Sequence, residues 1–260
     1  MATKTKSRNR FPWLVIALAI PALLVLLALG TWQVQRLAWK EGLIATVEAR
    51  MNTAPLPALE AVHSEDTVGG LDYRPVSISG TYKPGEVFFE FTTYNGVSGW
   101  NLFHLLEPPP NEQRRARYTI VNRGFIAYDM REQWEDVASL PEGEVELTGL
   151  LRMGLVEKPG FALPDNDEAQ RTFYWRSMQG MARAAGVDAG QVTDWYIDEG
   201  MPGEGQLGEW PVRGTTIVQF SNNHLQYAVT WYGLALTLVG VVGFFVAGRL
   251  RDGDDAANST

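Results

Sequence analysis

Two long apolar runs without charged residues constrain this chain more than any other feature. They lie at 11–29 and 226–248, with about 200 mostly polar residues between them. At about 1.5 Å per helical residue, runs of 19 and 23 residues can each cross a hydrocarbon layer roughly 30 Å thick. The sequence therefore predicts two membrane-spanning helices that hold one extramembrane domain between them.

Basic residues indicate how these two helices are oriented. They flank both runs on the side away from the domain: Lys4, Lys6, Arg8, Arg10, Arg249 and Arg251. Because positive loops stay in the cytoplasm, both termini are expected there and the domain on the outer face. An alternative is that the first run is a cleaved signal peptide, since Ala28 and Gly30 are small residues of the kind that a signal peptidase recognises.

The expected organisation has five segments, bounded as follows: a cytoplasmic basic leader at 1–10, a first transmembrane helix at 11–30, a periplasmic β-rich domain with a helical entry segment at 31–223, a second transmembrane helix at 224–248 and a cytoplasmic tail at 249–260. The short leader lacks the Arg- and Ser-rich amphipathic pattern of organelle import. This favours a multi-pass protein of a bacterial cell inner membrane.

Composition excludes several partners and chemistries. The chain has a net charge of -8, and residues 41–223 alone hold 27 Asp and Glu against 14 Lys and Arg, a net charge of -13. Such a surface repels phosphate backbones, so nucleic acid is not an expected partner. The chain has no cysteine, which excludes disulfides, thiolate catalysis and Cys-ligated metals.

The domain between the spans has a mainly β pattern. Short runs rich in Val, Ile, Thr and aromatic residues alternate with turn clusters of Gly, Pro and Asn. Strands are expected at 75–82, 86–94, 100–106, 117–127, 144–152, 173–177, 195–198 and 212–220. The predicted fold is an α+β membrane protein, in which two transmembrane helices flank one antiparallel β-rich barrel or sandwich outside the cytoplasm.

Two helical segments and a small core are also predicted for this domain. Residues 32–50 are expected to continue the first membrane helix, and 177–185 to form a short helix capped by Ser177. The four apolar strand residues expected in the core are Phe88, Ile120, Val121 and Leu147.

No catalytic motif is found, so the protein is not predicted to be an enzyme. The three histidines, His63, His104 and His224, form no zinc-binding spacing, and neither a GxSxG nor a phosphate-binding GxxxxGK[ST] stretch occurs. His104 is interpreted as a satisfied strand histidine. The acidic clusters at 165–168 and 198–199 are interpreted as solvated loop charges.

Polar and aromatic residues gather where the domain meets each span. The chain leaves and re-enters the membrane through one surface, so both groups are expected at a similar depth. The candidate binding residues are Trp32, Gln33, Arg36, His224, Gln226 and Tyr227. Anchoring at the lipid headgroups also accounts for the aromatic and basic side chains. From residue chemistry alone, a hydrogen-bonded structural role for His224 is preferred over ligation of a metal or heme, and both remain open.

Three ordered motifs resemble one known family. The residues Gly30-Thr31-Trp32-Gln33 follow the first span, Val121-Asn122-Arg123-Gly124-Phe125 lies mid-chain, and 223–232 opens the second span. Together they resemble the Surfeit-locus cytochrome c oxidase assembly factors. The stretches 149–152 and 173–175 also fit that family, whereas Phe125 and Ala127 replace its usual Trp and Pro.

The resemblance implies an assembly factor for aa3-type cytochrome c oxidase that binds heme a and assists its insertion into the catalytic subunit. It also implies His224 as the ligand of the heme iron, and heme a synthase is a candidate second partner. In the hypothesis drawn from it, Arg36 pairs with a propionate, Trp32 and Tyr227 flank the porphyrin, and Gln33 orients the histidine ring. The alternative is a cofactor-free membrane chaperone or scaffold that stabilises an oxidase assembly intermediate.

Overall fold

The computed structural model describes residues 13–64, 70–109, 116–135, 140–216 and 222–258, and the chain divides into two compact units. One unit comprises residues 1–45 with 220–260, and the other comprises residues 46–219. Because the two units are not placed relative to each other, each is described by itself.

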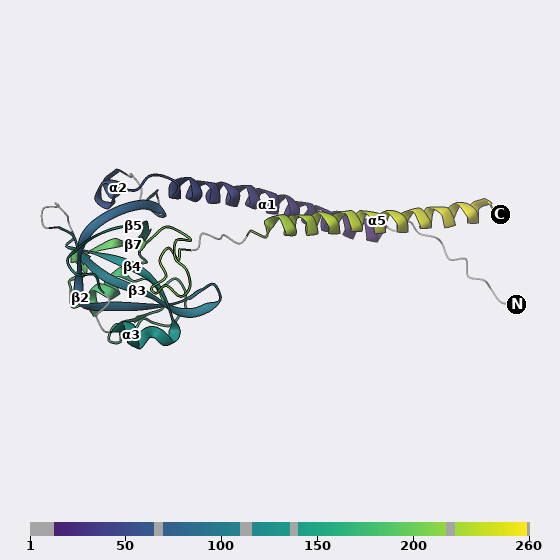
Figure 1. The fold of residues 1–260 in the computed structure, drawn as a ribbon. Coiled ribbons are helices and arrows are strands. Elements are labelled where there is room, and N and C mark those ends of the chain that lie inside the picture. Colours follow the sequence, from purple (N-terminus) through teal and green to yellow (C-terminus); the bar gives the residue numbers. More distant parts are fainter. Residues whose placement is uncertain (1–12, 65–69, 110–115, 136–139, 217–221, 259–260) are drawn as a thin grey trace. The chain divides into compact units, whose positions relative to one another are not determined.

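The first unit contains two long helices that run alongside each other, α1 (Trp13–Met51), whose residues from Thr46 on belong to the second unit, and α5 (His224–Asn258) (Figure 1). Both are long and apolar enough to cross a membrane, and only 6% of the residues in each apolar stretch are buried. In water such a surface would be unfavourable, whereas lipid would cover it. The expected continuation of the first membrane helix through 32–50 is confirmed.

A close seam joins the two helices of this unit. Gly30 is buried, and a Cβ atom built there would lie 2.9 Å from the ring of Tyr232. The hydroxyl oxygens of Thr31 and Tyr232 are 3.1 Å apart. On α5, Ala228 and Ala235 are each only 2% exposed. Small residues therefore let the helices approach at this level.

In the residues that the structure describes, the second unit is a seven-stranded sheet that closes on itself (Figure 1). Its strands are β1 (Leu56–Pro57), β2 (Arg74–Tyr94), β3 (Val97–Glu107), β4 (Tyr118–Ala127), β5 (Glu144–Met153), β6 (Thr172–Phe173) and β7 (Val192–Glu199). The order is β1-β2-β3-β4-β7-β5, and β2 also pairs with β5, which closes a barrel. The predicted β-rich domain between two membrane helices is thus confirmed. Most barrel pairs are antiparallel, as expected, but β4 and β7 run parallel.

Strand β2 makes the closure possible, because it is long and irregular at its middle. The sequence predicted two strands here, 75–82 and 86–94, whereas the structure has one strand of 21 residues. The register with β3 shifts between Tyr82 and Val87, where Gly85 has a φ of +82°. Irregularities of this kind bend a strand. The first half can therefore pair with β5 while the second half pairs with β3.

Two of the expected strands are wrong in extent. The run at 173–177 contributes only the end of β6, because the backbone N–H groups of Tyr174 and Trp175 donate to Asn166 Oδ1 instead of to a strand. In the run at 212–220, only Val212 forms an isolated bridge, and 213–216 lie outside any strand. Gly214 has a φ of +60°, which turns the chain. Residues 217–220 lie outside the described residues.

Side chains on both faces of the strands are buried, and short helices cover them. The helix α4 (Met178–Ala184) packs on one face, in a cluster with Phe88, Ile120 and Tyr196. The helices α2 (Ala58–Ser64) and α3 (Arg131–Glu135), with the 3-10 turns Tyr128–Met130 and Ala189–Gln191, complete the unit. The predicted cap of α4 is confirmed, since the Ser177 hydroxyl accepts from the Gly180 N–H. The four predicted core residues are all buried, including Val121 and Leu147.

Candidate functional site

The helix pair brings together two of the six predicted site residues. His224 is the first residue of α5, and Gln33 lies in the middle of α1. The Nδ1 atom of His224 and the Oε1 atom of Gln33 are 2.7 Å apart. Gln33 is only 8% exposed, although it lies on a helix whose neighbouring residues are largely exposed. This hydrogen bond joins segments that are 191 residues apart in the chain.

The bond determines which nitrogen of His224 is available for chemistry. An amide oxygen can only accept, so Nδ1 carries the hydrogen and donates it to Gln33. In the neutral ring the lone pair is then on Nε2, which makes no hydrogen bond with the described residues. A metal-binding histidine has this arrangement, with one nitrogen held by an acceptor and the other one open. His224 itself is half-buried.

The other four predicted residues lie on the same helices but form no polar contact with His224. Trp32 and Tyr227 are each 53% exposed, and Gln226 is also exposed. The guanidinium of Arg36 lies over the ring of Trp39, 3.8 Å from its centroid. Such a stack holds the cation at a modest gain, about 0.5–1 kcal/mol at exposed positions. The arrangement leaves these side chains available to a ligand without showing one.

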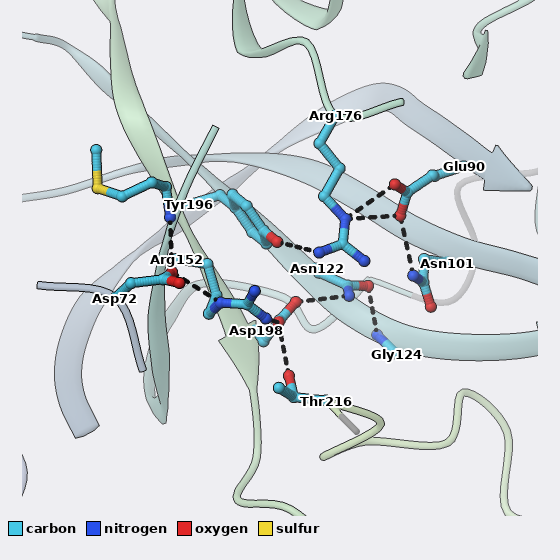
Figure 2. Close-up of polar contacts among 11 residues, drawn as sticks. Asp72, Glu90, Asn101, Asn122, Gly124, Arg152, Arg176, Tyr196, Asp198 and Thr216 are labelled. Carbon is cyan, nitrogen blue, oxygen red and sulfur yellow. Dashed lines mark hydrogen bonds and ion pairs between the residues drawn. The ribbon is translucent and has the colours of Figure 1, made fainter. Parts of the chain in front are cut away.

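A second polar cluster lies in the barrel, and the sequence analysis did not identify it. Figure 2 shows Asp198 of β7 at its centre. Asp198 Oδ2 accepts from Arg152 at 3.1 Å and from the Thr216 hydroxyl at 2.6 Å, and Asn122 donates to Oδ1 at 2.8 Å. Arg152 also donates from Nε to Asp72 at 2.9 Å. Both oxygens of the Asp198 carboxylate therefore accept hydrogen bonds.

The same cluster continues to a second arginine. Arg176 Nε donates to both oxygens of Glu90, at 2.9 and 3.0 Å, and Asn101 donates to one of them. Another nitrogen of Arg176 donates to the hydroxyl of Tyr196 (Figure 2). Burial raises the pKa of Tyr196 above its usual range, and Asp198 raises it further. The phenol is therefore neutral and can accept this bond.

A cavity of about 270 Å³ opens beside these side chains. Both arginines line it, together with Tyr73, Thr92, Thr93, Tyr94, Asn101, Asn122, Asp198, Thr215 and Thr216. Asp198, which lines the cavity, and Glu90, which pairs with Arg176, share a strand face with the α4 cluster, because each lies two residues from a member of that cluster, Tyr196 and Phe88. The barrel thus has an apolar interior that gives way to a polar cavity.

Two expectations about charged residues are corrected by this geometry. Asp198 was interpreted as a solvated loop charge, yet it is a strand residue that is 5% exposed. Glu199 is also in β7 and pairs with Arg213 at 3.2 Å, and burial raises its pKa. By contrast Asp165, paired with Lys158, has a side chain that is 91% exposed. Sequence position alone does not distinguish these carboxylates, because burial depends on which strand covers them.

His104 is buried in β3 as predicted, but it is not satisfied. Its Nδ1 is buried and has no hydrogen-bond partner among the residues that the structure describes. Burial, and to a smaller extent the positive charge of Arg123, lowers the pKa of His104 to about 3. The ring is therefore neutral and packs edge-on against Tyr82.

One signal for the barrel cluster was present in the sequence. Asn122 belongs to the mid-chain motif, Arg152 ends the stretch Gly149-Leu150-Leu151-Arg152, and Arg176 follows Phe173-Tyr174-Trp175. These three stretches were noted only for their resemblance to a family. The polar residues in or directly after these stretches line one cavity. A comparison of the polar residues in and after the three stretches would have indicated such a shared site.

The fold and the helix pair define a class of membrane protein, in which a β-barrel domain lies between two spanning helices and a histidine is held at the start of the second. Residues 20–236 match the model of the SURF1 family. The chain belongs to this family, whose members are cytochrome c oxidase assembly factors.

Curated relatives agree with this assignment. Surfeit locus protein 1 of Homo sapiens is 29% identical over 253 residues, which cover 90% of this chain and 77% of the relative. The Rattus norvegicus protein of the same name is 30% identical and covers 90% and 74%. A SURF1-like protein of Monosiga brevicollis is 29% identical and covers 92% and 88%.

Proposed function

We propose that this protein binds heme a through His224 and assists its insertion into the catalytic subunit of an aa3-type cytochrome c oxidase. The observation that supports this most directly is the 2.7 Å contact between His224 Nδ1 and Gln33 Oε1. It orients the imidazole and leaves Nε2 as the nitrogen that can ligate iron. Heme is the cargo here, and the iron that it carries serves the oxidase.

Further residues of the helix pair fit a heme with a lipid-soluble tail and charged propionates. Trp32 and Tyr227 present exposed aromatic surface that can pack against a porphyrin face. Arg36 can pair with a propionate through the nitrogens that do not face Trp39, and Gln226 offers an exposed amide on α5. In this proposal Gln33 is a positioning residue, because it acts on the cargo only through His224.

The proposed location is the inner membrane of a bacterial cell, with both termini in the cytoplasm and the barrel in the periplasm. Basic residues on the outer flanks of both apolar runs support this orientation. A reporter that is active only in the periplasm, fused near Gly143, should be active. Activity from a cytoplasm-dependent reporter at the same position would reverse the proposed topology.

The proposal is tested by the visible spectrum of the full-length protein purified in detergent. Protein from cells that make heme a should carry a heme a spectrum, and protein from cells that make only heme b should not. The His224→Ala variant should reach wild-type abundance but lose or shift the band. His104→Ala is the matched control, because this ring is buried in the barrel domain.

The second candidate is a cofactor-free scaffold that stabilises an assembly intermediate. It is favoured by the exposed aromatic side chains of the helix pair, which anchoring at lipid headgroups also explains. Absence of a heme spectrum from wild-type protein purified from cells that make heme a would support this candidate, whereas unchanged heme content and spectrum in His224→Ala would refute His224 as the ligand. Delivery from heme a synthase is a separate step, which a co-purification of the two proteins would test.

A further inference from the structure

The second half of β2 has one edge that no described strand covers. On that side β2 pairs with β5 at Arg74–Thr81 and with β6 at Phe89–Glu90. The β6 chain then turns away, and no strand pairing is recorded on this edge from Thr92 to Tyr94 among the described residues. A main-chain edge that ends beside a cavity is a place where another strand can be added.

The hairpin geometry shows which backbone groups face this edge. Tyr94 and Val97 close a two-residue turn with φ values of +49° at Asn95 and +81° at Gly96. In such a hairpin the closing pair is hydrogen bonded, so alternate residues direct their N–H and C=O groups away from β3. Thr93 is one of these residues. Phe89 lies four residues before Thr93, so its N–H faces the same edge, and it donates to the Arg171 carbonyl there at 2.9 Å.

The sequence does not protect this edge in the usual ways. Natural edge strands carry charges or proline that discourage pairing. None of the residues 91–100 is charged or proline. Instead Phe91 is 39% exposed and contacts an aromatic group formed by Trp100, Tyr128 and Tyr174. An apolar surface therefore lies on one face of the open edge.

The arginine-lined cavity lies on the other face, and its chemistry selects the side chain that would enter. The Nη2 groups of Arg152 and Arg176 make no hydrogen bond with described residues, whereas the carboxylates beside them are paired. The cavity thus has spare donors. The charged residues that line the cavity are Arg152, Arg176 and Asp198, and the two arginines also pair with Asp72 and Glu90 outside the lining. These five charges sum to -1, so a further anion is disfavoured. A neutral acceptor, such as a carboxamide, hydroxyl or peptide carbonyl, fits best.

We infer that the open edge of β2 binds an extended, uncharged segment of a different polypeptide by strand addition. Apolar side chains of that segment lie on the aromatic group around Phe91, and the alternate side chains bring neutral acceptors into the cavity. A second copy of this chain is a poorer occupant, because residues 41–223 carry a net charge of -13 and two such domains repel. The inference rests on the family's assembly role and does not depend on heme binding.

The test uses the full-length protein in membranes of cells that assemble the oxidase, with the photo-cross-linker p-benzoyl-phenylalanine at position 128. Tyr128 is 58% exposed, and its ring centroid is 6.3 Å from that of Phe91. The backgrounds are wild type, Thr93→Pro and Thr93→Val. Proline removes the N–H that faces the edge without removing a bond to β3, whereas valine keeps it. The same cross-linker at the exposed position Val156 is the control for general proximity.

Cross-linking from position 128 to another polypeptide should persist in Thr93→Val and fall about tenfold in Thr93→Pro, which corresponds to the loss of about one hydrogen bond. The yield of cross-linking from position 156 should be the same in wild type, Thr93→Val and Thr93→Pro. Equal yields in the two variants, a cross-link mainly to a second copy, or no cross-link to another polypeptide would overturn the inference.

Two measurements keep the result interpretable. Amide exchange of Thr93 in the wild-type protein should slow in the cross-linked complex, which tests the edge even if Thr93→Pro folds poorly. The heme content of Thr93→Pro should equal that of wild type. A protein without heme that still shows the Thr93-dependent cross-link would refute the proposed function alone, whereas unprotected amides in a heme-bearing protein would refute strand addition alone.

Discussion

The helix pair and the barrel both contain buried polar side chains, but they use them differently. In the barrel, Asp198 accepts bonds from three side chains, and both arginines are paired with carboxylates. In the helix pair, His224 has one bond, to Gln33, and keeps a second nitrogen open. The paired carboxylates stabilise the fold of the barrel, whereas the open nitrogen of His224 is available for a ligand. This difference separates the residues expected to hold the barrel together from those expected to bind cargo.

The largest expected effect is on the barrel cluster. Asp198→Ala removes the acceptor of Arg152, Asn122 and Thr216 and leaves a partly buried guanidinium without one of its two carboxylate partners. We expect a loss of about 3–5 kcal/mol in the free energy of unfolding, measured as a lower urea midpoint by tryptophan fluorescence. Asp165→Ala, which removes an exposed ion pair with Lys158, should change it by less than about 0.5 kcal/mol. Similar midpoints in the two variants would show that the cluster is not structural.

The second largest expected effect is the loss of stability of the barrel at acid pH, which depends on His104. Since the pKa of His104 is lowered to about 3, the unfolded chain binds a proton below about pH 6.5 that the folded chain excludes. Stability should therefore be complete above pH 6.5 and fall as the pH is lowered toward 3, by up to about 1.4 kcal/mol per pH unit from this group. In His104→Leu the urea midpoint should depend less on pH between 7 and 5. The same slope in both proteins would contradict the neutral buried ring.

A smaller effect is expected on heme retention when the acceptor of His224 is removed. Gln33→Leu leaves His224 Nδ1 without its acceptor, so the ring loses its orientation. Residues in this position typically change metal affinity by about 10–100-fold, and we expect a loss of heme retention in that range. Gln33→Glu keeps an acceptor and should restore retention with a shifted reduction potential. If Gln33→Leu retains heme as wild type does, the contact is structural only.

The smallest expected effect concerns the seam that brings His224 and Gln33 together. In Gly30→Ala the new Cβ would lie 2.9 Å from the Tyr232 ring, so the ring must move, at a cost of about 1 kcal/mol. The matched control is Gly42→Ala on the same helix, where no atom lies within 4 Å. Thermal unfolding of the heme-loaded protein should shift down only for Gly30→Ala. A downward shift in both variants would point to an effect of the helix backbone.

Apolar, acidic and histidine residues show how far the structure could be predicted from the sequence. Phe88 and Leu147 were correctly assigned to the core, because alternation along a strand is a local pattern. Asp198 was misassigned, because its burial depends on Arg152, a residue of another strand. His224 was placed near Gln33 by topology alone, since two spans that cross one membrane must meet at its surface. The structure contains a hydrogen bond between these two side chains. The role of His224 as a ligand remains a prediction.

By itself the sequence determined the two spans, the β-rich domain between them and the family. These follow from hydrophobic length, strand periodicity and ordered motifs, all of which are local in the chain. Only the tertiary structure decided that β2 closes the barrel, that Arg152 and Arg176 meet at one cavity, and that the β2 edge stays open. The reason is that strand register and the pairing of buried charges depend on contacts between residues far apart in sequence. No single segment contains that information.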